Sequence, residues 1–420
     1  MFRIAVFLGA CLLPLAGLFA QRTAHTLVWE NTFGGDVLDI ATALAPTPSS
    51  GGYIFTGYTK SVGAGGEDVW LVKTDKNGNV VWQKTIGGTK NDAANSIALT
   101  HDGGYVVAGY TYSKGSGESD VWVIKTDAQG NPQWEHTYGG LEADQAVAVL
   151  PTADGGYWIA AYHSKAPTKS SDMYSSIEGS TAASAEATQS QPRQQVIWLL
   201  KLNAAGLLQW NETYESADQN TPTAMLPMPD GGVLLVGNTL TKDRSSEGLL
   251  IRVKSDGSKI WQKNIGTNAW DALQAALLNA DNQILVGGTQ FVSRNNADAW
   301  LLKITLDGEI VWQHTYGSSE NETIQQLALA DEQHIAAAIN ITSPYAQPDL
   351  WMFAAFNAQG IMRESQIVGS TTVQQIRALQ PAPDKGFMLL GVPTLLRKCL
   401  QRGDRSTWLF RWGQPTEIDE

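Results

Sequence analysis

The sequence predicts an all-β fold: a seven-bladed β-propeller whose blades are four-stranded antiparallel sheets. Three observations carry this prediction. Tryptophan recurs at two fixed places in a repeat of about fifty residues, a period typical of solenoids and propellers. Each repeat alternates short apolar segments with glycine-containing turns and shows no helical periodicity. The first and last strands of the array are complementary fragments of one blade.

The clearest repeat, residues 92–140, gives the four expected strands in order. Residues 92–100 alternate small and apolar side chains, and a turn with two glycines follows at 101–104. Aromatic and β-branched residues fill the second strand, 105–111, and a Gly/Ser loop leads to the third, 120–127. The fourth strand spans 131–138. Four antiparallel strands per repeat favour a propeller blade over a leucine-rich or helical repeat.

A hairpin turn separates the third and fourth strands. The sequence Asp-Ala-Gln-Gly at 127–130 has counterparts at 75–78, 203–206 and 357–360. Asp or Asn begins a type I turn by accepting backbone N–H groups, and glycine supplies the positive φ that the following bulge needs.

Seven repeats can be counted from the tryptophan positions. The third-strand position is occupied by Trp70, Trp122, Trp198, Ile251, Trp300, Trp351 and Trp408. The fourth-strand position is occupied by Trp29, Trp82, Trp134, Trp210, Trp261, Trp312 and Glu364. Residues repeated in nearly every blade serve the repeat, so we expect these rings to fill the wedges between blades. Trp158, Trp270 and Trp412 lie outside the pattern, and we take Trp158 and Trp270 as candidates for ligand contact.

The two ends of the array predict how the ring closes. The array begins with a lone fourth strand, residues 26–32, and finishes with a lone third strand, residues 406–411. Pairing these two strands would complete the seventh blade and remove the exposed edges of an open sheet.

The N-terminal segment predicts export. Residues 1–20 resemble a secretory signal, with Arg3 before an apolar stretch and a cleavage site after Ala20. Lipidation at Cys11 is an open alternative. We therefore expect a signal peptide (1–20), a propeller (24–413) and a tail (414–420), in a chain that is periplasmic, cell-surface-associated or secreted. Without Cys11, Cys399 is the only cysteine, so we expect no internal disulfide.

Charge limits the classes of partner. The chain of 420 residues has a formal net charge of −12 at pH 7, and its longest basic run is Arg397-Lys398. Nucleic-acid binding would require a clustered basic face, so we expect no nucleic-acid partner. We also expect no transmembrane segment after signal cleavage, and a monomer.

Aligned starts of the first strands place carboxylates in five of seven positions: Asp39, Asp92, Asp144, Asn220, Asp271, Glu322 and Gln374. First strands are innermost in propellers, so these residues would lie near one mouth of the central channel. Asp39, Asp92, Asp144, Asp271 and Glu322 could together attract a cation such as Ca²⁺, because clustered carboxylates repel one another unless neutralised. Alternatively, each caps the glycine turn before it by accepting backbone N–H groups.

Cations recur three places after the third-strand position. They are Lys73, Lys125, Lys201, Lys254, Lys303 and Arg411. We expect them to pair across strands with fourth-strand residues such as Glu135 and Glu212, or to lay their apolar stems along the sheet.

The third repeat breaks the symmetry. Trp134 and Trp210 are 76 residues apart, against 52 for Trp82 and Trp134. The added segment lies within residues 163–195, which are rich in Ser, Thr, Ala and Gln and which we predict to be poorly ordered. A functional loop and a tolerated insertion are both open.

Signatures of catalysis are missing from the sequence. The six histidines show no metal-binding spacing, and we find neither a nucleophile elbow nor a phosphate-binding glycine loop.

The phrase spanning residues 68–88, followed by Asp-Gly-Gly-Tyr at 102–105, resembles the repeat of secreted bacterial and archaeal β-propeller proteins. Residues 75–82 are also similar to the quinoprotein (PQQ-like) repeat, and the blade order is like that of WD-repeat proteins. The resemblance implies binding and scaffolding roles more often than catalysis. Quinoprotein dehydrogenases typically have eight blades and a vicinal cysteine pair, and the sialidase Asp-box pattern is not matched here, so both enzyme readings weaken.

Taken together, the residues and the resemblance predict an exported, non-catalytic module that binds a protein or a glycan. The alternative is a propeller hydrolase or lyase acting on extracellular polysaccharide, with Ca²⁺ as its only expected cofactor.

Overall fold

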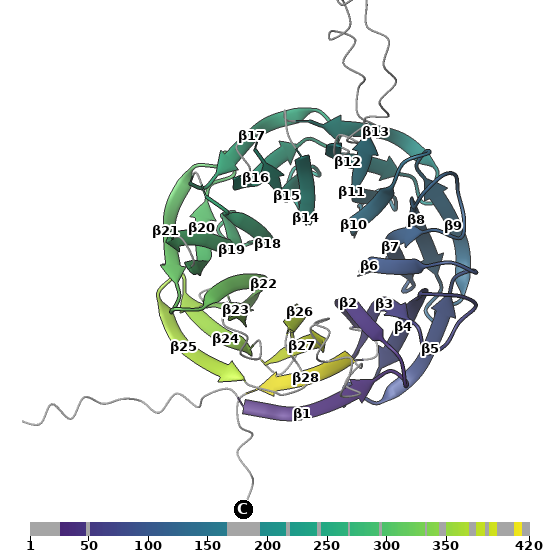
Figure 1. Cartoon of the computed structure of the whole chain (residues 1–420), viewed down its shortest axis with the longest axis horizontal. Coiled ribbons are helices and arrows are strands. Elements are labelled where there is room, and N and C mark those ends of the chain that lie inside the picture. Colours follow the sequence, from purple (N-terminus) through teal and green to yellow (C-terminus); the bar gives the residue numbers. More distant parts are fainter. Residues whose placement is uncertain are drawn as a thin grey trace, which may run out of the picture.

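The first strands of the repeats form the inner wall of a ring. The computed structural model describes residues 26–47, 51–165, 194–215, 219–241, 245–267, 269–293, 296–331, 334–343, 350–368, 375–382, 386–392 and 407–413. Its 28 strands form seven four-stranded antiparallel sheets, which Figure 1 shows arranged around a common centre. The molecule is a seven-bladed β-propeller, as predicted. None of the described segments is a helix long and apolar enough to cross a membrane.

Blades 1 to 6 each consist of four consecutive strands, from the inner strand to the outer one. Blades 1 and 2 contain β2 (Asp39–Thr47), β3 (Gly52–Thr59), β4 (Asp68–Thr74), β5 (Val80–Ile86), β6 (Asp92–Leu99), β7 (Tyr105–Thr111), β8 (Asp120–Thr126) and β9 (Pro132–Tyr138). Blades 3 and 4 contain β10 (Asp144–Pro151), β11 (Tyr157–Lys165), β12 (Gln194–Leu202), β13 (Leu208–Tyr214), β14 (Gln219–Pro227), β15 (Val233–Leu240), β16 (Ser246–Val253) and β17 (Lys259–Ile265). Blades 5 and 6 contain β18 (Ala272–Leu278), β19 (Ile284–Ser293), β20 (Asn296–Ile304), β21 (Ile310–Tyr316), β22 (Asn321–Asp331), β23 (His334–Thr342), β24 (Leu350–Asn357) and β25 (Met362–Val368).

Blade 7 joins the two ends of the array. It contains β26 (Gln375–Pro381), β27 (Phe387–Val392) and β28 (Thr407–Gly413), with β1 (Thr26–Phe33) as its outer strand. β1 and β28 pair antiparallel from Thr26 opposite Gly413 to Phe33 opposite Thr407, and they lie side by side in Figure 1. The predicted closure is therefore confirmed.

Thr407 also fastens blade 7 to blade 1. The side chain of Thr407 is buried, and its Oγ1 accepts a hydrogen bond from the backbone N–H of Ala41 at 2.9 Å. The same hydroxyl donates to the backbone carbonyl of Asp39 at 3.1 Å. One side chain thus satisfies two backbone groups of the neighbouring inner strand, across the junction where the chain ends meet.

Tryptophan packing confirms the structural interpretation of the repeat. Trp70, Trp122 and Trp300 on the third strands are at most 2% exposed. Fourth-strand tryptophans lie over the hairpin turn of the next blade: a Cβ on Gly130 would lie 2.6 Å from the Trp82 ring. Gly130 also has φ +76°, which favours glycine. The two repeated residue types therefore require each other across every such junction.

Strand pairing corrects the repeat alignment in two blades. In blade 4, Arg252 lies opposite Trp261, as Lys73 lies opposite Trp82 in blade 1. The cation of blade 4 is therefore Arg252 and not Lys254, and its third-strand position is Leu249, opposite Asn264, rather than Ile251. In blade 6, Trp351 is one residue away from the aligned position, which Met352 occupies.

The one-residue offset turns Trp351 to the opposite side of its strand. There it is buried, and its ring centroid lies 6.1 Å from that of Trp412 in blade 7. Tryptophan spacing alone does not reveal an offset of one residue, which in a strand reverses the face of the side chain.

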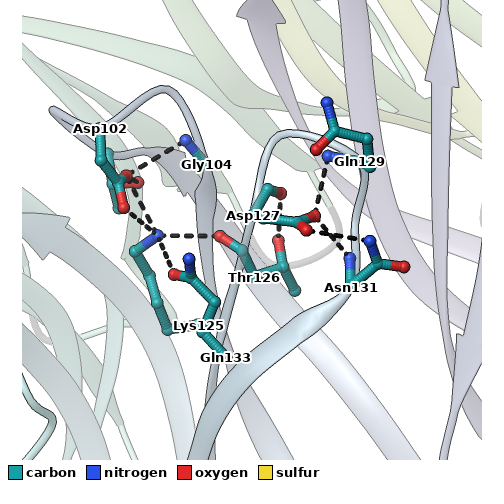
Figure 2. A network of polar contacts seen from close by, with 9 residues as sticks. Asp102, Gly104, Lys125, Thr126, Asp127, Gln129, Asn131 and Gln133 are labelled. Carbon is teal, nitrogen blue, oxygen red and sulfur yellow. Dashed lines mark hydrogen bonds and ion pairs between the residues drawn. The ribbon is translucent and has the colours of Figure 1, made fainter.

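Three of the repeated cations pair with turn carboxylates and not with fourth-strand glutamates. Figure 2 shows the Lys125 ammonium against Asp102, with an N–O distance of 2.8 Å, and beside Gln133 and the carbonyl of Thr126. Lys201 pairs with Asp154 and Arg252 with Asp230 in the same way. The predicted partner Glu135 instead pairs with Lys114. Because the Lys125 side chain is only 5% exposed, it must bond locally at the end of its own blade.

Each inner strand contains a β-bulge at the same place. The bulged residues are Thr42, Asn95, Val147, Thr223, Gln274, Gln325 and Arg377. Several reach the next blade: Thr42 Oγ1 donates to the carbonyl of Ala94 at 2.7 Å, and Asn95 Nδ2 to that of Ala146 at 2.8 Å. The bulges therefore aim polar side chains at the neighbouring inner strand.

Candidate binding face at the inner rim of the ring

One face of the ring carries the connections between blades and the loops between second and third strands. We call it the loop face. The two kinds of connection are bonded together: Tyr112 N–H donates to the carbonyl of Asn91, and Asp144 N–H to that of Ser119. The opposite face carries the short hairpin turns, such as the one containing Gln129, and we call it the turn face. Most of the residues singled out from the sequence lie on the loop face.

The inner-strand carboxylates cap the turns that precede them. Asp39, Asp92, Asp144 and Asp271 are fully buried, and Glu322 is 3% exposed. Their backbone donors or hydroxyl partners are Gly35 for Asp39 (2.6 Å), Gly88 for Asp92 (2.7 Å), Gly140 for Asp144 (3.0 Å), Thr267 for Asp271 and Ser318 for Glu322. The turn-cap interpretation is confirmed.

The second interpretation, a Ca²⁺ ring, stays a prediction. Among the residues that the structure describes, no three His, Cys, Asp or Glu side chains come together as a metal site. Asn220 is buried at the equivalent position of blade 4. Gln374 lies outside the described residues.

A second set of buried carboxylates was missed by the sequence analysis. Asp68 and Asp120, at the starts of third strands, are 1% and 2% exposed. A Cβ on Gly139 would lie 2.2 Å from Asp120 Oδ1 and 2.5 Å from Asp144 Oδ2, so these two oxygens are at most 4.7 Å apart. Burial raises the pKa of both carboxyls, and the charge of Asp144 raises the pKa of Asp120 further. Their repetition as the first residue of the Asp-Val-Trp phrase was the available signal.

Blade 3 has a histidine where blades 1 and 2 have a threonine that binds the inner-strand carboxylate. In blades 1 and 2, the hydroxyls of Thr59 and Thr111 donate to Asp39 and Asp92. In blade 3 the partner is His163, whose Nδ1 lies 2.5 Å from Asp144 Oδ1 and whose side chain is 31% exposed.

His163 lies at the base of the third-blade insertion. Residues 166–193 of the insertion lie outside the described part of the chain. At its two flanks, Lys165 forms an ion pair with Glu215, and the rings of His163 and Trp198 lie 5.8 Å apart. The predicted disorder and role of residues 163–195 therefore stay predictions.

Tyrosines form an arc along the inner rim. Tyr58, Tyr110 and Tyr162 occupy the same position of the second strands of blades 1, 2 and 3, next to residues of the inner strands. Their side chains are half-buried, and burial raises the pKa of Tyr58 and of Tyr162 to about 12. Tyr112 adds a fourth ring, with its centroid 5.9 Å from that of Tyr110.

Other blades use this position to hold the ring together. Asn238 in blade 4 accepts a hydrogen bond from Leu273 N–H at 2.7 Å, and Asn340 in blade 6 accepts one from Ile376 N–H at 2.9 Å. Thr289 in blade 5 donates to the carbonyl of Glu322. Blades 1 to 3 have large side chains with polar ends instead. The constant spacing of 52 residues between Tyr58, Tyr110 and Tyr162 was visible in the sequence and was not used.

Apolar side chains are exposed on the same face. Leu141, in the connection from blade 2 to blade 3, is 77% exposed, Tyr112 is 37% exposed and Trp270 is 53% exposed. Trp158, the other predicted contact residue, is 2% exposed and packs edge-on against Trp210 with ring centroids 5.0 Å apart. Of the two predicted tryptophans, the structure places only Trp270 where a ligand can touch it.

The fold and this face define a β-propeller, a class built around rigid blades that present loops on one face. No family model matches the chain. The regulatory protein FlaEY of Caulobacter vibrioides is 31% identical over 108 residues, which cover 23% of this chain and 11% of that protein. The matched segment is therefore a small part of both proteins.

Solved structures give the same fold. The Pan2 WD40 domain of Neurospora crassa superposes with a TM-score of 0.55 at 9% identity, covering 94% of this chain and 97% of that one. Sqt1 of Chaetomium thermophilum gives a TM-score of 0.50 at 10% identity over 92% of this chain and 100% of that one. Puromycin hydrolase gives 0.52 at 12% identity, over 86% of this chain and 53% of that one. At these identities the likeness shows the fold alone.

Proposed function

We propose that the chain is an exported binding module that recognises a protein through the inner rim of its loop face. The observation that carries the proposal is the tyrosine arc. Tyr58, Tyr110 and Tyr162 break the symmetry at a position where three other blades use Asn or Thr to fasten the next blade. Half-buried tyrosines supply contact area at low entropic cost, and they are enriched in protein-binding sites.

The neighbouring exposed groups support a protein ligand. Tyr112 contacts Tyr110 and adds apolar surface beside the arc, and Leu141 is exposed on the same face. Apolar contacts beside hydroxyl groups suit a peptide segment with mixed side chains. A glycan ligand, the other expectation, would use the same aromatic rings, so the experiment must separate the two.

Site-specific photo-crosslinking in the native cells tests this proposal. We would place a benzoylphenylalanine at Tyr112 or Leu141 on the loop face, and at Gln129 on the turn face as the matched control. We expect the same partner protein to crosslink from both loop-face positions and not from Gln129. Equal crosslinking from the two faces, or none from the loop face, would refute the proposal.

Export is tested by sequencing the N-terminus of the chain from those cells. A mature protein that begins at Gln21 supports cleavage of residues 1–20. A lipid-modified N-terminal Cys11 would support the lipoprotein alternative, and a retained Met1 would contradict export.

A second candidate function is cleavage of an extracellular polysaccharide, as a hydrolase or a lyase. It is favoured by one observation: Asp120 of blade 2 and Asp144 and His163 of blade 3 bring two close carboxylates and an imidazole together at the junction of these blades. A hydrogen-bonded His–Asp pair can serve as a general base. Turnover of polygalacturonate that is lost in His163→Asn would support this candidate, and an unchanged viscosity of the polymer would exclude this substrate.

Calcium binding is tested on the same chain. The variant carries Asp→Asn at three inner-strand positions: Asp92, Asp144 and Asp271. If the carboxylates bind Ca²⁺, addition of Ca²⁺ raises the melting temperature of the parent chain and not of the variant. If they act only as turn caps, Ca²⁺ leaves both melting temperatures unchanged and the variant melts lower.

A further inference from the structure

Arg377 is unusual among the residues that line the centre of the ring. It is the bulge residue of β26, the inner strand of blade 7. The six equivalent residues, from Thr42 to Gln325, are uncharged. Thr42 and Asn95 use their side chains to bond the next inner strand. Arginine has a longer side chain than these and a charged end, so it extends beyond the backbone that its counterparts bind.

The guanidinium of Arg377 has no bonding partner among the described residues. No ion pair or hydrogen bond to it is formed within those ranges, although carboxylates outnumber cations in the chain by 41 to 29. The side chain is exposed at the inner wall, yet its surroundings lower the pKa of Arg377 because they desolvate the charge. A partly desolvated cation without a counter-charge is unfavourable, and an incoming anion would remove that cost.

Tyr58 lies across the junction between blades 7 and 1 from this cation. β26 packs against β2, and Ile40 of β2 lies opposite Tyr58 on β3. The charge of Arg377 opposes the rise in the pKa of Tyr58 that burial causes. Glu67, whose charge acts on Tyr58, is already neutralised by Lys60, with an N–O distance of 3.0 Å. Arg377 and Tyr58 are therefore two hydrogen-bond donors on either side of the junction where the tyrosine arc begins.

We propose that Arg377 and Tyr58 bind a carboxylate of an acidic peptide segment that enters the inner rim of the loop face. The planar guanidinium donates two parallel N–H bonds to a carboxylate, and the phenol adds a third donor. Tyr110 and Tyr162 continue the row of hydroxyls, and Leu141 supplies apolar contact for the flanking side chains. This inference rests on the proposed function and specifies the chemistry of the partner.

Calorimetric titration of the full chain with synthetic peptides tests the inference. The probe is an eight-residue peptide of alternating Glu and Leu with blocked ends, and the matched peptide has Gln in place of Glu. We expect binding of the Glu peptide to weaken about ten-fold or more in Arg377→Gln and by a smaller factor in Tyr58→Phe, since bonds to charged groups are the stronger ones. Arg363→Gln, an exposed arginine on the outer strand β25, should leave binding unchanged.

Three results of the titrations would overturn the inference. They are equal affinity for the Gln peptide, unchanged binding in Arg377→Gln, and binding of tetragalacturonate without binding of the Glu peptide, which would assign the site to an acidic glycan. Melting temperature and near-UV circular dichroism confirm that each variant is folded. Crosslinking from Tyr112 that persists in Arg377→Gln, with no binding of the Glu peptide by the parent chain, would refute the carboxylate site and leave the binding face intact.

Discussion

Replacing Thr407 by valine tests how the ring is held closed. The two side chains have nearly the same shape, so the change removes the hydroxyl and preserves most of the packing. The Ala41 N–H loses an acceptor at 2.9 Å in a fully buried position, and the Asp39 carbonyl loses a donor at 3.1 Å. A buried group left without a partner costs about 1 to 3 kcal/mol, and we expect a loss of that size in the free energy of unfolding.

The expected change in melting temperature is small. Unfolding entropy is about 2.1 cal/mol/K per residue, or roughly 0.8 kcal/mol/K for the propeller, so the loss corresponds to about 1 to 4 °C. Urea unfolding followed by tryptophan fluorescence gives the free-energy difference directly, because the chain has 15 tryptophans spread over its blades.

Thr56→Val is the matched control. Thr56 is also fully buried, but its hydroxyl only donates to the carbonyl of Trp70 at 3.1 Å within blade 1. Its removal therefore leaves no buried N–H group without an acceptor. We expect Thr56→Val to destabilise the protein less. If the two variants lose the same free energy of unfolding, the hydroxyl of Thr407 has no special part in closing the ring.

Two further predictions concern the turn face. Gly130→Ala should destabilise the protein more than Gly103→Ala, because both glycines have φ of +76° to +79° but only a Cβ at Gly130 would meet the Trp82 ring; comparison of the two urea midpoints checks this. Burial raises the pKa of Asp102, but hydrogen bonds from Lys125 and other donors outweigh it and lower the pKa to about 2. The stabilisation from this carboxylate is therefore complete above its unfolded pKa of about 3.9 and is lost as the pH falls toward 2. The difference in urea midpoint between the parent chain and Asp102→Asn should shrink over that range, and a constant difference would contradict the assignment.

The period of the repeat was enough to predict the architecture. Strands, hairpin turns and closure all follow from local rules: alternation within strands, Asp and Gly at fixed turn positions, and complementary ends. The predicted fourth strand at 26–32 and third strand at 406–411 differ from β1 and β28 by no more than two residues at any end. Each strand or turn signal lies within a few residues, so a single sequence contains it.

Contacts between repeats were harder to predict. The partner of Lys125 lies 23 residues away in another turn of its blade, and nothing in the local sequence favours Asp102 over Glu135. Bulges shift the register by one residue without changing the hydrophobic pattern. For this reason the sequence did not reveal that Arg377 occupies the bulge position of its inner strand. Trp351 was misplaced for a related reason, since it lies one residue before the aligned position, which Met352 occupies, and the tryptophan spacing does not reveal so small an offset.

The residues of the candidate site were the hardest to predict from the sequence. Asp68 and Asp120 looked like ordinary strand residues, and only the structure shows that they lie against glycines just after the outer strands of their own blades. The tyrosine arc was present as a periodic signal, but periodic residues were assigned to packing. Its significance came from the contrast with Asn238 and Asn340, whose bonds to the next blade are visible only in three dimensions.

The pairing of β1 with β28 also sets an order for folding. Six blades are each built from one continuous stretch of chain and can form as soon as that stretch is available, whereas blade 7 joins residues separated by more than 360 positions. Contacts of such long range form slowly, so the final junction is the step most exposed to failure. A chain stopped before β28 would retain six blades with two unpaired strand edges, β1 among them, and such edges can pair with another molecule. The strand that completes the ring in the intact protein would then promote aggregation of an incomplete one.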